Sequence, residues 1–440
     1  MRYDRPCARL TIFSKGLITM LLRLVLCVLA LLPAAAAFQA AQPVETYRPS
    51  QYPDRIILNW TEDASAGFAV TWRTSTAVSH GFAEIAQAGE NAEFAKSAKR
   101  VTAATEAYST DLGPAHAHSV TFTGLQPSTA YSYRVGDGAN WSPWNTLKTA
   151  SQRPEPFTFV YFGDAQSGIL PYWSRLVRQA YAHAPNARFL LHAGDLINRS
   201  TLDQEWGEWH AGAGWINQVI PSVPTPGNHE YGRLAENGPR VLTSNWRPQF
   251  TLPLNGVAGA EESNYFIDIH DLRVIVLNSN VLHKEQAVWL EKVLASNPKA
   301  WTIITFHHPV YSTAVRRDNK ELRELWQPIF DRYRVDLVLN GHDHVYGRTR
   351  LVTGTVYAVS SAGTKFYERK PTAVFDRIAE DTQLFQVIRI DGNRLVYEAR
   401  TVSGALYDSF ELTKRRGRPN RHTNRIPATP QRLRPAAAAR

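Results

Sequence analysis

The sequence predicts two folded domains, an all-β sandwich followed by a layered α/β domain. Residues 44–150 form a succession of short strand-like segments separated by turn residues, with no convincing helix among them. From residue 157 onward, apolar strands alternate with helical patterns, which is typical of an α/β fold. Five of these later strands end in side chains that bind metal ions, so the second domain is expected to carry the chemistry.

The first domain is expected over residues 44–150, and its strand and turn pattern indicates a small β-sandwich. The stretch "SVTFTGLQPSTAYSYRVG" resembles the end of a fibronectin type III-like domain, in which a loop precedes a strand that carries a tyrosine. The segment "SQRPEP" at 151–156 reads as a linker. The predicted strands are "RIILNWT", "GFAVTWRT", "FAEIAQA", "HSVTFTGL" and "AYSYRVGD".

The second domain, expected over residues 155–413, begins with the strand "FTFVYFGD". A helix, "PYWSRLVRQAYAHA", is predicted next, because Pro171 can take its first position and the apolar residues that follow share one face. Further strands alternate with the helices "KEQAVWLEKVLAS" and "ELRELWQPIFDRY". The strands "TQLFQVIRI" and "RLVYEARTV" then form a closing hairpin around Asp391-Gly392.

The N-terminal residues 1–40 are typical of a targeting segment. Basic residues precede the apolar stretch "LVLCVLALLP", and "AAAAFQA" offers small residues for cleavage. A membrane anchor is the rival interpretation, but the apolar stretch is shorter than the roughly 18 residues that a spanning helix needs. Both cysteines, Cys7 and Cys27, lie in this segment. The processed chain would then lack cysteine, which suits a periplasmic or secreted protein.

The net charge of +10 comes from the two ends of the chain. Residues 1–40 contribute +4 and residues 414–440 contribute +9, which leaves −3 for the body between them. We expect residues 414–440 to form a disordered, solvated tail. The alternative is a tail that contacts an anionic surface or nucleic acid. We expect no specific nucleic-acid partner for the body and no stable membrane span.

Five strand ends share side chains that bind hard or borderline metal ions. Ligands in open α/β sheets bind beyond the carboxyl ends of the strands, and glycine lets the backbone turn sharply there. A single Gly-Asp pair is usually only a turn, but five such ends in one domain predict a dinuclear metal site. They are Gly163-Asp164, Gly194-Asp195, Gly227-Asn228-His229, His307-His308 and Gly341-His342-Asp343-His344.

With these motifs, the chain resembles the calcineurin-like metallophosphoesterases, and specifically the purple acid phosphatase branch. The five blocks of that family are matched by "GDAQ", "GDLIN", "GNHE", "ITFH" and "GHDH", and the resemblance extends over about residues 44–413. It implies a four-layer catalytic domain, with β-sheets sandwiched by helices. The usual extension of the last block keeps Tyr346 and Arg348, but Gly347 stands where the branch has a glutamate.

The resemblance also implies the ligands of two divalent metal ions, or of a mixed-valence iron pair, with Fe, Zn and Mn as the candidate elements. Asp195 would bridge the two ions. Asp164 and His344 would hold the first ion, whereas Asn228, His307 and His342 would hold the second. Imidazole and carboxylate suit these metals, and a metal-bound hydroxide could attack phosphorus in line.

Of the remaining candidates, His229 is expected to be catalytic, because it follows the ligand Asn228 and could protonate the leaving group. His308 and Arg348 are candidates for substrate contacts, with support of the ligands as the alternative. Glu230 could orient His229 or cap the turn.

Two positions depart from the resembled family. Gln166 stands where many metallophosphoesterases have a histidine, and Asn198 stands where the purple enzymes have a tyrosine. Either amide is a candidate metal ligand, or Gln166 could only hydrogen-bond its loop. The purple colour of the resembled enzymes comes from a tyrosinate bound to ferric iron, so this protein is expected to be colourless or pale.

The sequence therefore predicts an exported phosphomonoesterase that acts on a phosphate ester. A phosphodiesterase on the same scaffold is the alternative, because the metal ligands do not select between the two substrates. A non-catalytic surface-binding protein is a further alternative, which a functional His229 would contradict.

Overall fold

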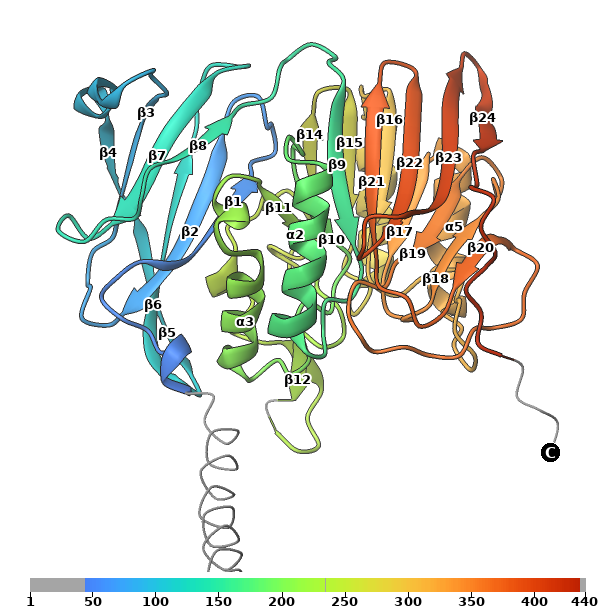
Figure 1. Cartoon of the computed structure of the whole chain (residues 1–440), viewed down its shortest axis with the longest axis horizontal. Helices are drawn as coiled ribbons and strands as arrows, with labels where there is room; N and C mark the ends of the chain where they lie inside the picture. The colour runs from blue at the N-terminus through green and yellow to red at the C-terminus, as the bar shows by residue number, and fades with distance from the viewer. Residues whose placement is uncertain (1–43, 234, 436–440) are drawn as a thin grey trace, which may run out of the picture. The chain divides into compact units, whose positions relative to one another are not determined.

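The computed structural model describes residues 44–233 and 235–435 (Figure 1). Residues 1–48 form one unit and residues 49–440 another. In the first unit, the described structure is a 3-10 turn, Val44–Tyr47. The expected targeting segment, residues 1–40, lies outside the described residues. Among the described residues, none of the helices is both long enough and apolar enough to span a membrane.

The second unit begins with the predicted β-sandwich, which consists of two four-stranded antiparallel sheets. Their inward side chains, including Trp72 and Tyr133, are fully buried and form a common core. The first sheet has the order β1 (Asp54–Trp60), β2 (Phe68–Ser75), β6 (Gly113–Phe122), β5 (Ala104–Thr110). The second has the order β4 (Lys99–Thr102), β3 (Phe82–Gln87), β7 (Ala130–Gly136), β8 (Asn145–Lys148).

Two seven-stranded sheets form the centre of the α/β domain. The first has the order β11 (Ser222–Pro224), β10 (Leu190–His192), β9 (Phe157–Phe162), β21 (Leu384–Asp391), β22 (Arg394–Thr401), β23 (Leu406–Arg415), β24 (Arg418–Asn424). The second has the order β14 (Tyr265–Ile269), β15 (Leu272–Val276), β16 (Trp301–Thr305), β17 (Leu337–Asn340), β19 (Val356–Val359), β18 (Tyr346–Thr349), β20 (Phe375–Ala379).

Helices cover the outer faces of these sheets, so the domain has the four predicted layers (Figure 1). The alternation along β15 shows the arrangement: Val274 packs into the core shared with the first sheet, whereas Ile275 packs against the helices on the other side. The helices are α2 (Ser174–His183) and α3 (Asp203–Ala213) on the first sheet, and α4 (His283–Ala295) and α5 (Lys320–Tyr333) on the second.

Buried ion pairs join the sandwich to the α/β domain. Asp203, at the start of α3, is fully buried and accepts hydrogen bonds from Arg55 at 2.6 Å and from Arg73 at 2.8 Å. Trp60 at the end of β1 donates its indole N–H to the carbonyl of Arg188. The arginine contacts fix the sandwich against the helix that follows β10, and the Trp60 contact fixes it against the segment that precedes β10.

The prediction of a disordered tail is wrong for residues 414–424. These residues complete β23 and form β24, which pairs antiparallel with β23 around Gly417 (φ 71°). Lys414 and Asn420 both contact the buried carboxylate of Asp336 at 2.5 Å. The acidic body therefore supplies partners for the basic segment, so the charge of that segment does not prevent folding.

Candidate metal centre

The strand ends named by the sequence converge at one edge of the two sheets. Asp164, Asp195 and Asn228 follow the neighbouring parallel strands β9, β10 and β11. His307 and the pair His342 and His344 follow the neighbouring parallel strands β16 and β17. Because parallel strands end at the same edge, local motifs far apart in the sequence meet there.

The first cluster consists of Asp164, Asp195 and His344, whose ligand atoms all lie within 4.8 Å of one another. All three side chains are almost completely buried. The Nε2 atom of His344 lies 3.6 Å from Oδ1 of Asp164. Two buried carboxylates beside an imidazole fit a cation, because carboxylates removed from water without a positive partner are costly.

The second cluster is centred on Nε2 of His307. This atom lies 3.1 Å from Oδ2 of Asp195 and 3.2 Å from both Oδ1 of Asn228 and Nδ1 of His342. His308 joins the same group, together with His307 and His342. Asp195 of the first cluster therefore lies in contact with His307 of the second, at the position that a ligand shared by two metal ions would occupy.

The backbone of this edge adopts conformations that side chains disfavour. Asp195, His342 and His344 have positive φ values of 52°, 74° and 50°. A Cβ atom on Gly227 would lie 2.1 Å from Oδ1 of Asp195, and one on Gly341 would lie 2.6 Å from Oδ2 of Asp164. Strained residues persist where the surrounding structure holds them, and they concentrate at functional sites.

Hydrogen bonds behind the clusters aim the ligands inward. Nδ1 of His307 lies 2.8 Å from the carbonyl oxygen of Ala193, which leaves Nε2 facing the cluster. The fully buried carboxylate of Glu230 accepts N–H bonds from Gly227 at 2.6 Å, Asp195 at 3.0 Å and Leu196 at 2.8 Å. Of the two roles considered for Glu230, the structure thus shows the cap, and this cap holds the loop of Asp195.

The pKa values reflect the concentration of buried charge. Burial, reinforced by Asp195, raises the pKa of Asp164 to about 7. Burial lowers the pKa of His307, but the carboxylates of Asp195 and Asp164 outweigh it and raise this pKa to about 9. Burial lowers the pKa of His344 to about 3, so this imidazole stays neutral and can act as a ligand. The donor set therefore fits two borderline metal ions.

His229 lies at the rim of the clusters with one ring nitrogen fixed. Its backbone N–H donates to Oδ1 of Asp195 at 2.8 Å, and Nδ1 lies 2.5 Å from the carbonyl oxygen of Asn198. Nε2 lies 3.9 Å from Oδ2 of Asp195, and the side chain is 24% exposed. The ring can therefore reach a substrate bound at the clusters.

Gln166 and Asn198, the two amides that depart from the resembled family, lie in different positions relative to the clusters. Gln166 is fully buried in the first cluster, with Nε2 2.7 Å from Oδ2 of Asp195 and 3.2 Å from Nε2 of His344. Its Oε1 atom is buried without a partner, and turning the amide over would present that oxygen to the cluster. Asn198 contributes its backbone, which accepts from His229 and donates to Glu205 at 2.7 Å.

His308 and Arg348, the two candidates for substrate contacts, also have different surroundings. His308 packs on His342 with ring centroids 4.2 Å apart, and its Nδ1 lies 2.9 Å from Oγ of Ser279. The expectation that Arg348 contacts substrate is wrong, because its fully buried guanidinium is already bound by other side chains. Asp408 accepts from Nε and Nη2, and Asn424 accepts from Nη1 at 2.9 Å.

Three residues at the mouth of the site were missed by the sequence reasoning. The ring of Tyr367 lies 5.0 Å from the ring of His344. The guanidinium of Arg317 lies 4.6 Å and the ammonium of Lys365 lies 5.5 Å from the centre of the Tyr367 ring. Arg317 also donates to the carbonyl of His342. All three lie in loops with no strand-end motif, so no signal in the sequence indicated Tyr367, and only a positive charge could have pointed to Arg317 and Lys365.

Comparisons with known families give two matches along the chain. Residues 157–346 match Calcineurin-like phosphoesterase, and residues 53–149 match the N-terminal domain of Purple acid phosphatase. The chain is 24% identical over 330 residues to purple acid phosphatase 1 of Ipomoea batatas, covering 71% of this chain and 68% of that protein.

Other relatives are matched over a smaller share of their length. An uncharacterized protein of Mycobacterium tuberculosis is 26% identical over 344 residues, which cover 68% of this chain and 62% of that protein. The Fe(3+)-Zn(2+) purple acid phosphatase 12 of Arabidopsis thaliana is 25% identical over 257 residues, which cover 55% of this chain and 54% of the relative.

Solved structures share the fold. The purple acid phosphatase PPD1 from yellow lupin (Lupinus luteus) seeds superposes with a TM-score of 0.71 at 20% identity, covering 82% of this chain and 74% of the other. The structure of PhoD superposes with a TM-score of 0.65 at 13% identity, covering 87% of this chain and 95% of the PhoD chain. The order of a β-sandwich and a four-layer α/β domain is thus common to all three.

Proposed function

We propose that this chain, which matches Calcineurin-like phosphoesterase over residues 157–346 and the N-terminal domain of Purple acid phosphatase over residues 53–149, hydrolyses phosphate monoesters at a dinuclear metal centre. The observation that carries the proposal is the position of Asp195, which belongs to one donor cluster and lies 3.1 Å from His307 of the other. A purely structural site has no need of the adjacent imidazole of His229, which is held at the rim by the Asn198 carbonyl. This argues against a non-catalytic binding protein.

In this proposal, Asp164, Gln166 and His344 would hold the first ion, Asn228, His307 and His342 would hold the second, and Asp195 would be a ligand of both. When bound, the two ions would polarise the phosphoryl oxygens and lower the pKa of a bound water toward about 7. His229 keeps Nε2 free while Nδ1 is fixed, so this nitrogen can hold a proton at the leaving oxygen. Glu230 keeps the Asp195 loop in place during this reaction.

The charge at the mouth favours a monoester over a diester. Arg317 and Lys365 flank Tyr367 beside His344. Lys365 forms no ion pair with any residue in the described part of the chain. Arg317 is paired with Asp343 at 3.4 Å, so Lys365 is the unpaired cation of the two. A phosphate monoester is a dianion near neutral pH and a diester is a monoanion, so Lys365 attracts the monoester more strongly.

The test is a rate comparison on the metal-loaded full chain. Hydrolysis of 4-nitrophenyl phosphate should exceed that of bis(4-nitrophenyl) phosphate, and both should vanish on chelation and return with metal. Lys365→Gln should raise KM for the monoester about fivefold and change the diester KM little. Lys320→Gln, on the exposed face of α5, is the matched control. A preference for the diester that survives Lys365→Gln would favour the phosphodiesterase alternative instead.

We also propose that the protein is exported and is periplasmic or secreted. The supporting observations are the apolar segment with basic and small flanking residues in 1–40 and the absence of cysteine from 41–440. Sequencing the N-terminus of protein from the extracellular or periplasmic fraction tests this, since a retained Met1 would contradict cleavage.

A further inference from the structure

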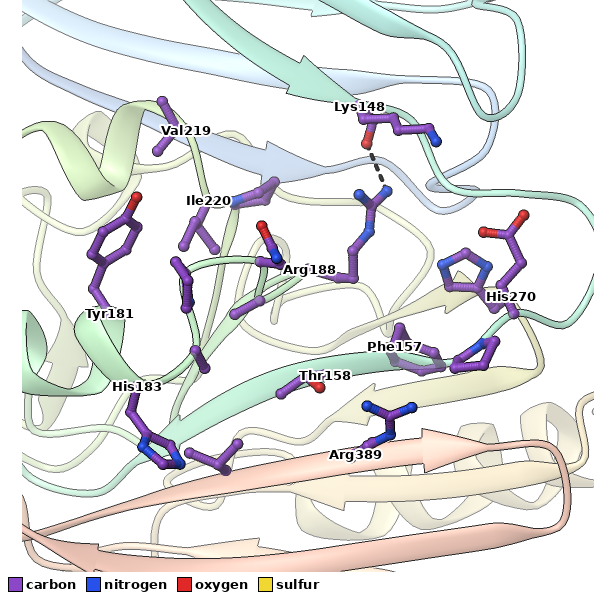
Figure 2. Close-up of a pocket in the computed structure, with 18 of the residues that line it drawn as sticks. Lys148, Phe157, Thr158, Tyr181, His183, Arg188, Val219, Ile220, His270 and Arg389 are labelled. Carbon is purple, nitrogen blue, oxygen red and sulfur yellow. Dashed lines mark hydrogen bonds between the residues drawn. The ribbon is translucent and has the colours of Figure 1, made fainter. Parts of the chain in front are cut away.

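A groove of about 1060 Å³ lies between the sandwich strand β8, helix α2 and the strands β21 and β22 (Figure 2). It is lined by Phe157 and Thr158 at the amino end of β9, whereas Asp164 follows the other end of this six-residue strand. A strand of that length spans about 20 Å. The groove is therefore separate from the metal centre and has no part in the proposed hydrolysis.

Arg188 lines this groove with most of its hydrogen-bonding capacity unused. Among the described residues it forms no ion pair, and its guanidinium makes one hydrogen bond, to the carbonyl of Lys148 at 2.6 Å (Figure 2). Its Nε atom is buried without a partner. Arg348 and Arg377, by contrast, make several hydrogen bonds each: Arg348 is bound by Asp408, and Arg377 donates to the carbonyls of Tyr407 and Thr429. An arginine carries five N–H donors, so Arg188 has donors to offer a ligand.

His270 lies beside Arg188 on the same side of the groove (Figure 2). The residue is only 7% exposed, and its Nδ1 atom is buried without a hydrogen-bond partner. Its ring packs on Phe157 with centroids 4.9 Å apart, so the orientation is fixed. Unpaired buried polar atoms cost free energy unless a ligand or water satisfies them.

The charges along the groove favour an anion. Its cations are Lys148, Arg188, Arg389 and Arg394, and its carboxylates are Glu155 and Glu398. Glu398 is already bonded to Arg400 at 2.8 Å. Arg394 and Arg389 are likewise paired, with Glu411 at 2.7 Å and with Asp391 at 3.5 Å. Lys148 and Arg188 are the groove cations that remain to favour an acidic group. The two carboxylates would repel a polymer with a phosphate at every unit, but they can accept hydrogen bonds from hydroxyl groups.

The other end of the groove offers an aromatic surface. Trp215 is 54% exposed, and its ring meets Tyr181 edge to face with centroids 4.8 Å apart. Tyr181 lies at the end away from Arg188 and His270 (Figure 2). A large exposed tryptophan presents a flat apolar face with a polar edge, which suits stacking against a sugar ring. The volume is large for one small anion and fits an extended molecule.

We propose that this groove binds an acidic oligosaccharide, with a carboxylate held by Arg188 and His270 and a sugar ring stacked on Trp215. The sugar hydroxyls would contact the carboxylates of Glu155 and Glu398. The site would fix the enzyme to an acidic glycan while the metal centre, at the far end of β9, stays open to substrate.

Calorimetric titration of the metal-loaded full chain with tetragalacturonate tests the proposal. Arg188→Gln and Trp215→Ala should each weaken binding about tenfold or more, because one removes charged hydrogen bonds and the other an aromatic contact. Arg332→Gln and Tyr52→Ala are matched control variants, since both side chains are exposed and neither lines the groove. The neutral maltotetraose should bind much more weakly than the acidic probe.

All four variants should keep the wild-type rate on 4-nitrophenyl phosphate, which shows that they are folded and separates this test from that of the proposed function. The proposal is overturned if tetragalacturonate does not bind, or if Arg188→Gln and Trp215→Ala bind it as the wild type does. Tighter binding of a single-stranded oligothymidylate than of tetragalacturonate would overturn it in favour of a nucleic-acid groove.

Discussion

At the scale of single residues, two hydrogen bonds, one to Asp195 and one to Asn198, hold His229 in position. Its backbone N–H bond to Asp195 holds the residue beside the proposed bridging ligand, and the bond from its ring to the Asn198 carbonyl fixes the direction of the ring. These contacts leave Nε2 for the substrate. In the proposed mechanism, proton transfer would therefore fall to this one nitrogen.

His229→Ala should reduce kcat by roughly 10²–10⁴ on alkyl phosphates, because the leaving alkoxide needs a proton. The loss should be much smaller on 4-nitrophenyl phosphate, whose leaving group is stable as an anion. Steady-state rates over a series of leaving groups measure this. An equal loss across the series would mean that His229 binds phosphate and does not transfer a proton.

Asn198 bears on the spectrum of the iron-loaded protein. An amide at the position where the resembled enzymes have a tyrosine supplies no tyrosinate, so the protein loaded with iron should be colourless or pale. The visible spectrum before and after reduction checks this. An intense band that disappears on reduction would contradict it, and Tyr367, beside His344, would then be the tyrosine to replace with phenylalanine.

At the scale of elements, the ligand-bearing strand ends could be predicted because each motif is local. Asp164, Asp195 and His307 each follow a run of apolar residues, and the parallel pairing brings the runs together. Helix α3 was missed because Trp206 and Gly207 are both buried, so the helix has no clear polar face. Strand β24 was missed because it lies at the edge of its sheet, where half of a polar sequence can face water.

The role of Arg348 could not be read from its motif for a related reason. Its partners Asp408 and Asn424 lie 60 and 76 residues later in the chain. A local motif shows which charged residue is present, but it does not show which residue distant in the sequence will pair with that charge. The mouth residues Lys365 and Tyr367 are likewise placed by the fold of a loop.

Ending the chain at Thr413 tests the corrected view of the C-terminal segment. The truncation removes Lys414 and Asn420, which contact the buried Asp336 carboxylate, and it removes β24. Stability should fall by about 3 kcal/mol or more, because breaking a buried pair leaves an uncompensated charge. Urea unfolding measures the change, with a chain ending at Pro435 as the control. Equal midpoints would show that β24 contributes nothing.

In the sandwich, the buried imidazole of His118 should make the protein less stable in acid. The ring is fully buried between the hydroxyl groups of Thr74 and Thr105, and burial, with a contribution from His116, lowers its pKa from 6.5 to about 4. Between these values the unfolded chain takes up a proton and the folded chain does not. This group therefore makes the protein less stable as the pH falls from 6.5 to 4, by about 1.4 kcal/mol per pH unit at most.

Unfolding midpoints at pH 7.5 and 4.5 measure this dependence. His118→Gln should reduce the difference between the two midpoints, whereas His80→Gln, at an exposed position, should leave it as in the wild type. An unchanged difference in His118→Gln would show that other groups cause the acid sensitivity.

At the scale of the whole molecule, the basic charge and the chemistry occupy different places. The net charge of +10 comes from the two ends, and part of the C-terminal charge is bound in pairs such as Lys414 with Asp336 and Arg434 with Asp381. The metal centre and the groove lie at opposite ends of β9. One scaffold can therefore hold a catalytic site and a separate binding site without interference between them.

The most direct test of the central claim is the metal content and turnover of Asp195→Asn. The account predicts two metal ions per wild-type chain by elemental mass spectrometry, and at most one in the variant, because Asp195 serves both clusters. Turnover of 4-nitrophenyl phosphate should fall by roughly a thousandfold or more, since two bound ions would supply the attacking hydroxide in the proposed mechanism. A variant that keeps two ions per chain and near-normal turnover would contradict the shared position of Asp195 and the dinuclear mechanism with it.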